Sequence, residues 1–185
     1  MSGKKSLRAE MIARRDALAE EERRRYARAL ADALAALPQY TSARSVLATM
    51  SIGSEIDTRP FLERSDAEGK AIVLPRVCGK PSRLRLHAVG DLDRDLVPGV
   101  WNIPEPDPVR CPEVALGDVD FAWIPALAAN RAGYRLGYGA GYFDRLLTGR
   151  GSRPYCVVAL PEPFVRDDVP HDPHDIPVDL VLSAP

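Results

Sequence analysis

The sequence predicts a single α/β domain over residues 1–185, with a mostly parallel open sheet and helices on both of its faces. Three observations predict this class. Short apolar runs of strand composition recur along the chain, segments with helical periodicity stand between them, and 185 residues are the size of one domain. Two of the runs, "AIVLP" (71–75) and "YCVVAL" (155–160), are almost entirely apolar, as in strands covered on both sides.

The chain begins with two predicted helices. The first spans residues 4–18 and is rich in Lys and Arg. The second follows "AEEE" (19–22) and runs to Leu37, because apolar residues recur at steps of four, four and three from Tyr26 onward. Pro38 is predicted to close this helix.

A strand, a short helix and two more strands are predicted next. Residues 45–50 have strand composition, and Thr58 with Pro60 predicts the start of a short helix that ends near Gly69. The strand at 71–75 follows. The alternation of apolar and polar residues in 84–89 then predicts a half-exposed third strand.

The second half of the chain mixes loops with buried strands. Residues 90–112 are rich in Pro, Asp and Gly, which predicts an ordered loop. "VDFAWIP" (119–125) is a predicted buried strand, and "FDRLL" (143–147) predicts a helix. After the strand at 155–160, "VDLVL" (178–182) is predicted to be the last strand.

Composition excludes several classes of protein. The net charge of −1 leaves no overall field to hold nucleic acid, and no apolar run approaches the ~20 residues of a membrane span. Three widely spaced cysteines predict neither a disulfide framework nor a zinc site. We therefore expect a protein that binds neither nucleic acid nor membranes, and we take it to be a cytoplasmic monomer.

The segment "GYRLGYGAGYFDR" (133–145) carries the strongest functional signal. Three glycines alternate between 137 and 141, and glycine lets successive backbone amides turn inward to bind an anion. Arg135 and Arg145 flank them, and guanidinium groups match phosphate oxygens. Asp144 follows, where a carboxylate can hold Mg²⁺ against phosphates. The alternative interpretation is a tight turn with a solvated face.

The whole series of motifs resembles the 5-formyltetrahydrofolate cyclo-ligase family. The resemblance spans nearly the whole chain and keeps its order. Its segments are "KKSLR", "ARRDAL", "GSEIDT", "PGVWNIPEP", "DFAWIPALA", "AGYRLGYGAGYFDRLL" and "HDIPVDLVL". The family's fold is similar to that of sugar-phosphate isomerases and coenzyme A transferases, which agrees with the α/β prediction.

The resemblance implies an enzyme that converts 5-formyltetrahydrofolate to 5,10-methenyltetrahydrofolate. ATP is the co-substrate and Mg²⁺ the cofactor, and ADP and phosphate are released. The formyl oxygen is phosphorylated and N10 of the substrate then closes the ring. Such a reaction needs positioning and charge neutralisation more than a protein nucleophile. This need agrees with the absence of a recognisable catalytic dyad, and the resemblance makes Arg135 and Arg145 the catalytic candidates.

The resemblance also assigns binding roles, residue by residue. The residues expected to bind ATP are Lys4, Arg8, Arg14, Arg135, Leu136, Gly137, Tyr138, Gly139, Ala140, Gly141, Tyr142 and Phe143. Those expected to bind the folate are Met50, Glu55, Trp101, Tyr138, Gly139, Ala140, Gly141 and Tyr142. The expected metal ligands are Asp144 and Asp179.

Several of these residues also have plain structural interpretations. Lys4 and Arg8 fit a solvated basic helix face, and Glu55 fits a cap for the helix beginning near Thr58. Trp101 fits a loop anchor, and Asp179 fits a strand-edge residue facing water.

A pair of histidines allows two interpretations. His171 and His174, among aspartates, resemble a metal site. Prolines at 170, 173 and 177 favour a rigid loop instead.

The sequence departs from the family pattern at three single positions, and its segment "LPEPFVRDD" (160–168) lacks the Gln usually found nearby. Asn130 stands where Asp is common, Ala140 where Gly or Lys is common, and Phe143 where Tyr is usual. These departures keep open a non-catalytic folate or nucleotide binder. A third possibility is a sugar-phosphate isomerase-like or coenzyme A transferase-like enzyme on the same scaffold.

Overall fold

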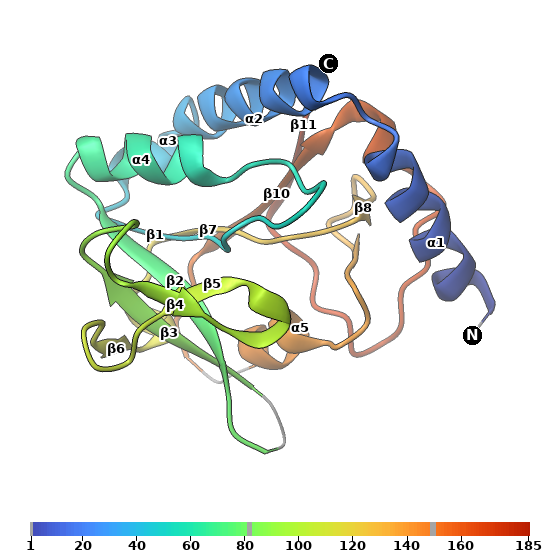
Figure 1. Cartoon of the computed structure of the whole chain (residues 1–185). Coiled ribbons are helices and arrows are strands. Elements are labelled where there is room, and N and C mark those ends of the chain that lie inside the picture. The colour runs from blue at the N-terminus through green and yellow to red at the C-terminus, as the bar shows by residue number, and fades with distance from the viewer. Residues whose placement is uncertain (1, 81–82, 149–150) are drawn as a thin grey trace.

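The computed structural model describes residues 2–80, 83–148 and 151–185, which form an α/β fold around one large sheet (Figure 1). In the described residues this sheet has seven strands in the order β11-β10-β7-β1-β2-β3-β6. The first five in that order run parallel to their neighbours, and β3 and β6 run antiparallel. The predicted mostly parallel sheet is confirmed.

The strands of this sheet are β1 (Ser45–Leu47), β2 (Ala71–Cys78), β3 (Arg83–Val89), β6 (Glu113–Val114), β7 (Phe121–Trp123), β10 (Tyr155–Pro161) and β11 (Leu180–Ala184). Two small hairpins pair β4 (Leu96–Pro98) with β5 (Pro104–Pro106), and β8 (Ala128–Ala129) with β9 (Arg135–Leu136). The helices are α1 (Ser2–Asp16), α2 (Glu20–Ala35), α3 (Pro38–Ser42), α4 (Arg59–Ala67) and α5 (Tyr142–Leu147). Short 3₁₀ turns lie at η1 (Val100–Asn102), η2 (Leu116–Asp118) and η3 (Glu162–Phe164).

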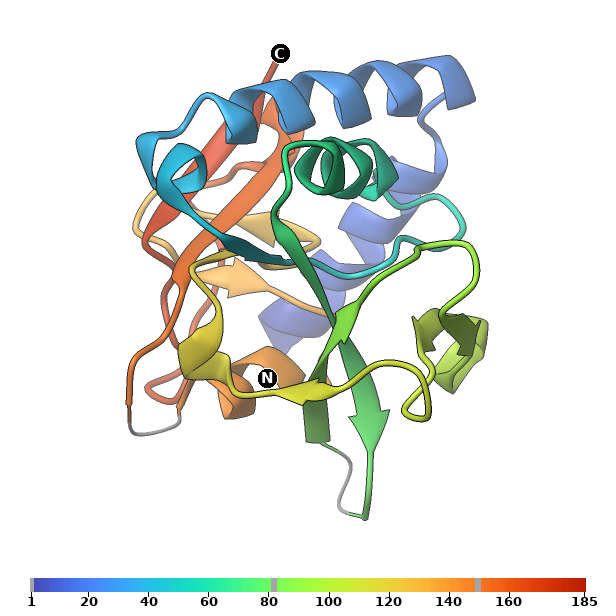
Figure 2. The ribbon, with the colours of Figure 1, turned by 90° about the vertical axis from the view of Figure 1, so that its left-hand side faces the viewer.

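Helices cover both faces of the sheet, as predicted. Figure 1 shows α2, α3 and α4 together above the sheet and α5 below it, and Figure 2 shows the same layers from the side. Side chains alternate along each strand, so neighbouring residues enter different cores. Val157 packs in the core under α2 and α4, and Val158 in the core that also contains Leu7 and Met11 of α1.

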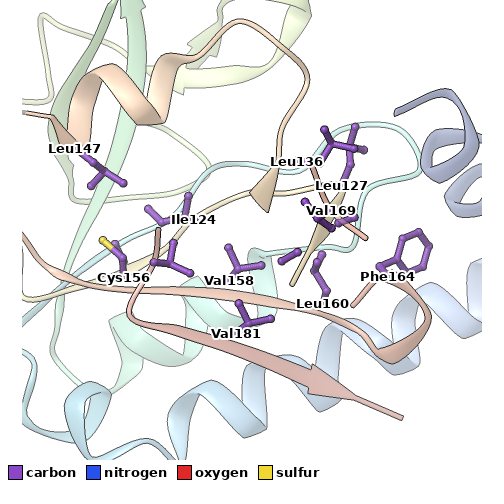
Figure 3. Close-up of a cluster of buried hydrophobic side chains, with 14 of the residues drawn as sticks. Ile124, Leu127, Leu136, Leu147, Cys156, Val158, Leu160, Phe164, Val169 and Val181 are labelled. Atoms are coloured by element: carbon purple, nitrogen blue, oxygen red, sulfur yellow. The ribbon is translucent and has the colours of Figure 1, made fainter. Parts of the chain in front are cut away.

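The core shared by α1 and α5 supports the glycine segment. Figure 3 shows Val158 and Leu160 of β10 beside Leu127 and Leu136, which flank the β8–β9 hairpin. Leu136 is 1% exposed, so the residue just before the glycines is fixed in the core. The glycine segment therefore leaves the core from a rigid point.

Two local predictions were wrong. The second helix was predicted to run to Leu37 and to be closed by Pro38. Instead, α2 ends at Ala35, and Pro38 is the first residue of a separate helix, α3. Proline suits this position because its missing N–H would have no partner in the first turn. Residues 90–112 are not all loop, because they contain the β4–β5 hairpin.

None of the helices in the described residues is long and apolar enough to cross a membrane.

Candidate functional site

The glycine loop, residues 137–141, joins β9 to α5. Gly139 (φ 103°) and Gly141 (φ 65°) have left-handed backbone conformations that favour glycine. Within the described part of the chain, the backbone N–H groups of residues 137–143 have no protein acceptor. A run of unpaired amides is what an anion-binding loop requires.

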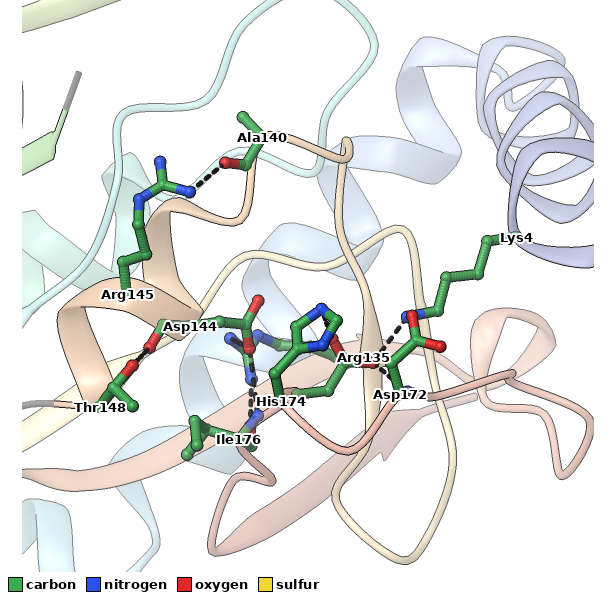
Figure 4. A network of polar contacts seen from close by, with 10 residues as sticks. Lys4, Arg135, Ala140, Asp144, Arg145, Thr148, Asp172, His174 and Ile176 are labelled. Carbon is green, nitrogen blue, oxygen red and sulfur yellow. Dashed lines mark hydrogen bonds and ion pairs between the residues drawn. The ribbon is translucent and has the colours of Figure 1, made fainter. Parts of the chain in front are cut away.

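Two arginines hold the loop through its carbonyl groups. Arg8 Nε donates to Gly137 O at 2.8 Å, and Arg145 Nη1 donates to Ala140 O at 2.7 Å (Figure 4 shows the second contact). The C=O and N–H of one planar trans peptide point in opposite directions. The N–H groups of Tyr138 and Gly141 therefore point away from these arginines, toward a ligand position. A Cβ on Gly139 would lie 3.3 Å from Arg8 Cζ, so glycine permits the close approach.

Arg135 and Asp144 form an ion pair beneath the loop. Arg135 Nη2 lies 2.8 Å from Asp144 Oδ1, and the N–H of Ile176 donates to the same oxygen at 3.2 Å (Figure 4). The Arg135 side chain is 5% exposed and the Asp144 side chain 25%. In the described residues, Asp144 Oδ2 has no hydrogen-bond partner, so this oxygen is available to a cation. Arg135 is nearly buried and ion-paired, so its contact in this structure orients the carboxylate of Asp144.

Asp179 is arranged differently. Both of its carboxylate oxygens contact Arg153, at 2.7 and 3.0 Å, and Oδ2 also accepts the N–H of Cys156 at 2.7 Å. Asp144 is thus ion-paired with Arg135, whereas Asp179 is ion-paired with Arg153. Asp179 has to release Arg153 before it can bind a metal.

Helix α1 lies against the glycine loop and the C-terminal loop. Lys4 Nζ contacts Asp172 at 2.7 Å and Asp175 at 2.6 Å (Figure 4 shows the Asp172 contact). Burial by itself lowers the pKa of Lys4, but the two carboxylates outweigh it and leave the pKa raised. One turn along, Arg8 reaches the glycine loop. The basic face is therefore partnered, not merely solvated.

The 171–175 segment forms a loop around this lysine. The ring of His171 stacks on Tyr134 with centroids 3.8 Å apart. Ligand atoms of Asp172, His174 and Asp175 lie within 4.8 Å of one another, but the ammonium group of Lys4 already contacts both carboxylates. The rigid-loop interpretation fits this arrangement.

Tyr138, Glu55 and Arg15 meet at the carboxyl edge of the sheet. The Tyr138 hydroxyl donates to Glu55 Oε1 and accepts from Arg15 Nη1. Burial, followed by the hydrogen bond to Glu55, raises the pKa of Tyr138 to about 12, so this phenol stays protonated at neutral pH. Beside these residues is a narrow cavity of about 60 Å³, also lined by Trp123, Pro125 and other residues at or just beyond the carboxyl ends of β1, β7 and β10. Ligands of parallel α/β sheets bind at this edge.

Arg15 was missed by the sequence analysis, which singled out Arg14. Arg14 is directed elsewhere and contacts Pro163 O at 3.2 Å. The spacing of the basic residues along the helix would have indicated Arg15. At about 100° per residue, Lys4, Arg8 and Arg15 fall within about 40° of one another around α1, whereas Arg14 is about 100° from Arg15.

Two other predicted folate residues, Met50 and Trp101, are not among the residues that line this cavity. Met50 is 8% exposed and packs in the core under α2 and α4. Trp101 is 67% exposed in the β4–β5 connection, with a left-handed φ of 56°, and Asn102 follows with 61°. Such conformations are costly for residues other than glycine, so this connection presents an indole at the surface at some cost in backbone strain.

The three departures from the family pattern have local explanations. Asn130 Oδ1 accepts the N–H of Tyr134 at 3.0 Å and so caps the β8–β9 turn, a role that needs only one oxygen. Phe143 packs against the core, and Ala140 contributes its carbonyl group to Arg145. The guanidinium group of Arg145 lies over the ring of Tyr142, and Arg145 Cζ is 5.2 Å from the ring centroid.

A parallel sheet with an unpaired glycine loop and arginines near its carboxyl edge is typical of α/β enzymes that bind phosphorylated ligands. Comparison with known proteins identifies the particular family. The model of the 5-formyltetrahydrofolate cyclo-ligase family matches residues 1–184. The chain therefore belongs to the 5-formyltetrahydrofolate cyclo-ligase family, a family of ATP-dependent enzymes.

Individual relatives agree with this family. The 5-formyltetrahydrofolate cyclo-ligase of Mycolicibacterium smegmatis is 30% identical over 97% of this chain and 93% of its own length. The mouse enzyme of that name is 29% identical over 98% and 93%. The solution structure of Aquifex aeolicus 5,10-methenyltetrahydrofolate synthetase is 33% identical, with a TM-score of 0.84 over 97% of this chain and 89% of that one.

Proposed function

We propose that this protein converts 5-formyltetrahydrofolate to 5,10-methenyltetrahydrofolate at the expense of ATP, and that it does so as a monomer in the cytoplasm. Family membership supports the reaction. The observation that carries the proposed site is the run of unpaired amides at residues 137–143, with Arg8 and Arg145 on their carbonyl side. We assign the ATP phosphates to these amides.

The reaction has two steps, a phosphoryl transfer and a ring closure. The formyl oxygen of the substrate attacks the γ-phosphorus of ATP, and the bond to ADP breaks. The lone pair of N10 then attacks the formyl carbon, the carbon–oxygen bond breaks, phosphate leaves, and N10 loses its proton. Because nucleophile and electrophile belong to one molecule, the protein acts chiefly by holding them in position and by offsetting negative charge.

The residues around Asp144 fit a magnesium ion. Mg²⁺ is usually held by one or two carboxylates together with substrate phosphates, and Asp144 Oδ2 has no protein partner in the described residues. Bound there, Mg²⁺ would neutralise charge on the phosphates. Asp179 remains a second proposed ligand, on condition that Arg153 moves away.

The folate position follows from the carboxyl-edge cavity. Glu55 Oε2 is held by the N–H of Ile52 at 3.0 Å, and Oε1 contacts Tyr138. A pterin that presents N–H groups to Glu55 would displace the Tyr138 hydroxyl. Ligand pockets usually exceed ~300 Å³, so this cavity of about 60 Å³ has to widen as the substrate enters.

The decisive experiment measures methenyltetrahydrofolate formation by absorbance with and without ATP, for the wild type and Asp144→Asn. We expect ATP-dependent product, and a loss of at least about 100-fold in kcat for the variant, as for other groups that act on transition-state charge. Asp32→Asn, on the exposed surface of α2, is the matched control and should retain full activity. Product without ATP contradicts the proposal, and so does an Asp144→Asn variant that loses activity only because it unfolds.

A further inference from the structure

One feature that the proposed reaction does not use is a basic cavity on the β2–β3 hairpin. It has a volume of about 480 Å³. Its lining includes Arg76, Lys80, Arg83 and Arg85, with Glu113 as the one carboxylate. The cavity is therefore strongly positive in a protein whose net charge is −1.

Strand register explains how these charges gather. Residues directly opposite on β2 and β3 share a face of the sheet, and Arg76 pairs with Arg85. The same face is apolar further along β2, where Ile72 and Leu74 pack in the core under α4. Beyond the helix the face turns basic. Like charges directly opposite each other destabilise a hairpin, so this pairing needs a compensating anion.

The protein supplies only part of that compensation. Arg85 contacts Glu113 at 2.9 Å, and Arg76 lies 3.9 Å from Glu105. Within the described residues, neither Lys80 nor Arg83 has an ionic partner. Two cations are thus left for a ligand.

A buried histidine gives the second, independent observation. His87 also lines the cavity, is 4% exposed, and is directly opposite Glu113 in the register. Its Nδ1 lies 2.8 Å from Cys111 O, an acceptor, so Nδ1 carries a proton. Its Nε2 is the only buried side-chain nitrogen or oxygen in the described residues that has no hydrogen-bond partner. Such a group costs free energy unless a ligand pairs with it.

We propose that this cavity binds a small multivalent anion, with Lys80, Arg83 and Arg85 contacting its oxygens and protonated His87 donating from Nε2. The half-exposed side chain of Arg85 swings aside to admit an oxygen to His87. Carboxylate and phosphate oxygens share this chemistry. The anion is either an independent metabolite or the carboxylates of the folate substrate, and the site itself does not depend on the proposed reaction.

The test is calorimetric titration of the full-length protein with citrate and with pyrophosphate at low salt. We expect binding that weakens as salt is added and that falls about tenfold in Arg83→Gln, the usual effect of losing one charged hydrogen bond. Arg28→Gln makes the same charge change on the exposed surface of α2 and should bind like the wild type. Equal affinity for the wild type and Arg83→Gln, or equal losses in Arg83→Gln and Arg28→Gln, overturns the proposal.

His87 has its own test. Asn at position 87 keeps an N–H for Cys111 O and removes Nε2. The groups facing His87 are Arg76 from β2, Arg85 on its own strand, Glu113 from β6 and the Cys111 carbonyl. Citrate should bind His87→Asn about tenfold more weakly than the wild type, because the N–H donated from Nε2 is lost. Equal affinity of the two proteins for citrate removes His87 from the site.

Kinetics then separate the two sources of the anion. If the substrate's own carboxylates bind here, Arg83→Gln raises KM for the folate and citrate competes with the folate. If the anion is independent, KM for the folate is unchanged while citrate still binds. Failure of the ligase assay leaves the titrations valid, so the two proposals can fail separately.

Discussion

Arg15 links three groups from two other parts of the chain, and the farthest of them, Tyr138, lies 123 positions away in the sequence. Its guanidinium contacts the Tyr138 hydroxyl, lies 3.7 Å from Glu55, and donates to Ser54 Oγ at 3.0 Å. Because its side chain is only 16% exposed, these contacts are weakly screened by water. Arg15 therefore fixes Glu55 and Tyr138 relative to each other.

The first prediction compares neighbouring arginines. Arg15→Gln should raise KM for the folate and lower kcat/KM about tenfold, because a charged hydrogen bond to the Glu55–Tyr138 pair is lost. Arg14→Gln removes the same charge from a side chain that donates to Pro163 O and forms no ion pair with the described residues, and should change kcat/KM less than about twofold. Steady-state kinetics with varied folate check this. Equal effects of the two substitutions would show that only the charge of α1 matters.

For single residues, the sequence predicted the type of backbone loop better than it predicted which side chains contact each other. The glycine alternation predicted a loop with free amides, and the described residues have them. That Arg135 would contact Asp144 could not be read from the chain, because the contact depends on how β9, α5 and Ile176 pack together. The same holds for the Tyr138–Glu55 contact, whose partners lie on different elements.

The element that sets the direction of the glycine loop is the β8–β9 hairpin. Its turn is closed by Asn130, and the N–H of Val178 donates to Gly133 O at 3.0 Å, which joins the turn to the chain before β11. Gly133 has a φ of 92°, and a Cβ there would lie 2.5 Å from Val178 O. Glycine is required at this position for two separate reasons.

The second prediction separates those reasons. Gly133→Ala should cost at least about 2 kcal/mol of unfolding free energy, because the left-handed backbone and the clash with Val178 O act together. Gly69→Ala is the matched control: Gly69 has a φ of 77° but no atom near its would-be Cβ, so only the backbone term remains. Thermal unfolding of both variants measures the difference. A Gly69→Ala loss as large as that of Gly133→Ala contradicts the prediction.

Elements were predictable where their apolar pattern was long. The runs at 71–75 and 155–160 lie within β2 and β10. The helices predicted over 4–18 and from after residue 22 to Leu37 correspond to α1 and α2, although α2 begins at Glu20 and ends at Ala35. The β4–β5 hairpin escaped because it is short and contains three prolines, and its pairing comes from contact with β2 and β3. Proline also misled at Pro38, because the same residue that ends one helix suits the first turn of the next.

At the scale of the whole molecule, α1 is fastened by charge at its N-terminal end. The ion pair between Lys4 and the two aspartates joins residues 168 and 171 positions apart. Lys4 lowers the pKa of Asp172. Burial opposes the shift at Asp175, but hydrogen bonding to Lys4 and backbone leaves its pKa lowered too.

The third prediction concerns acid. Carboxyl groups with lowered pKa contribute stability above their unfolded pKa of about 4, and lose it as the pH falls through their folded pKa. The pKa of Lys4 is raised, so its ammonium group stays charged throughout the acidic and neutral range. Lys4→Met should therefore lower the urea midpoint at pH ~7 and have a much smaller effect near pH ~3. An equal shift of the midpoint at both values would assign the effect to packing instead of charge.

The distance in sequence between the two halves of the proposed nucleotide site affects how the protein is made. Lys4 and Arg8 leave the ribosome about 130 residues before the glycine loop, and Asp172 and Asp175 follow about 30 residues after the loop. Because a chain is made from the N-terminus onward, the first helix cannot dock until these later segments have emerged. A nascent chain that stops before residue 172 therefore lacks both acidic partners of Lys4, and the first helix is fastened beside the glycine loop only after those residues have been made.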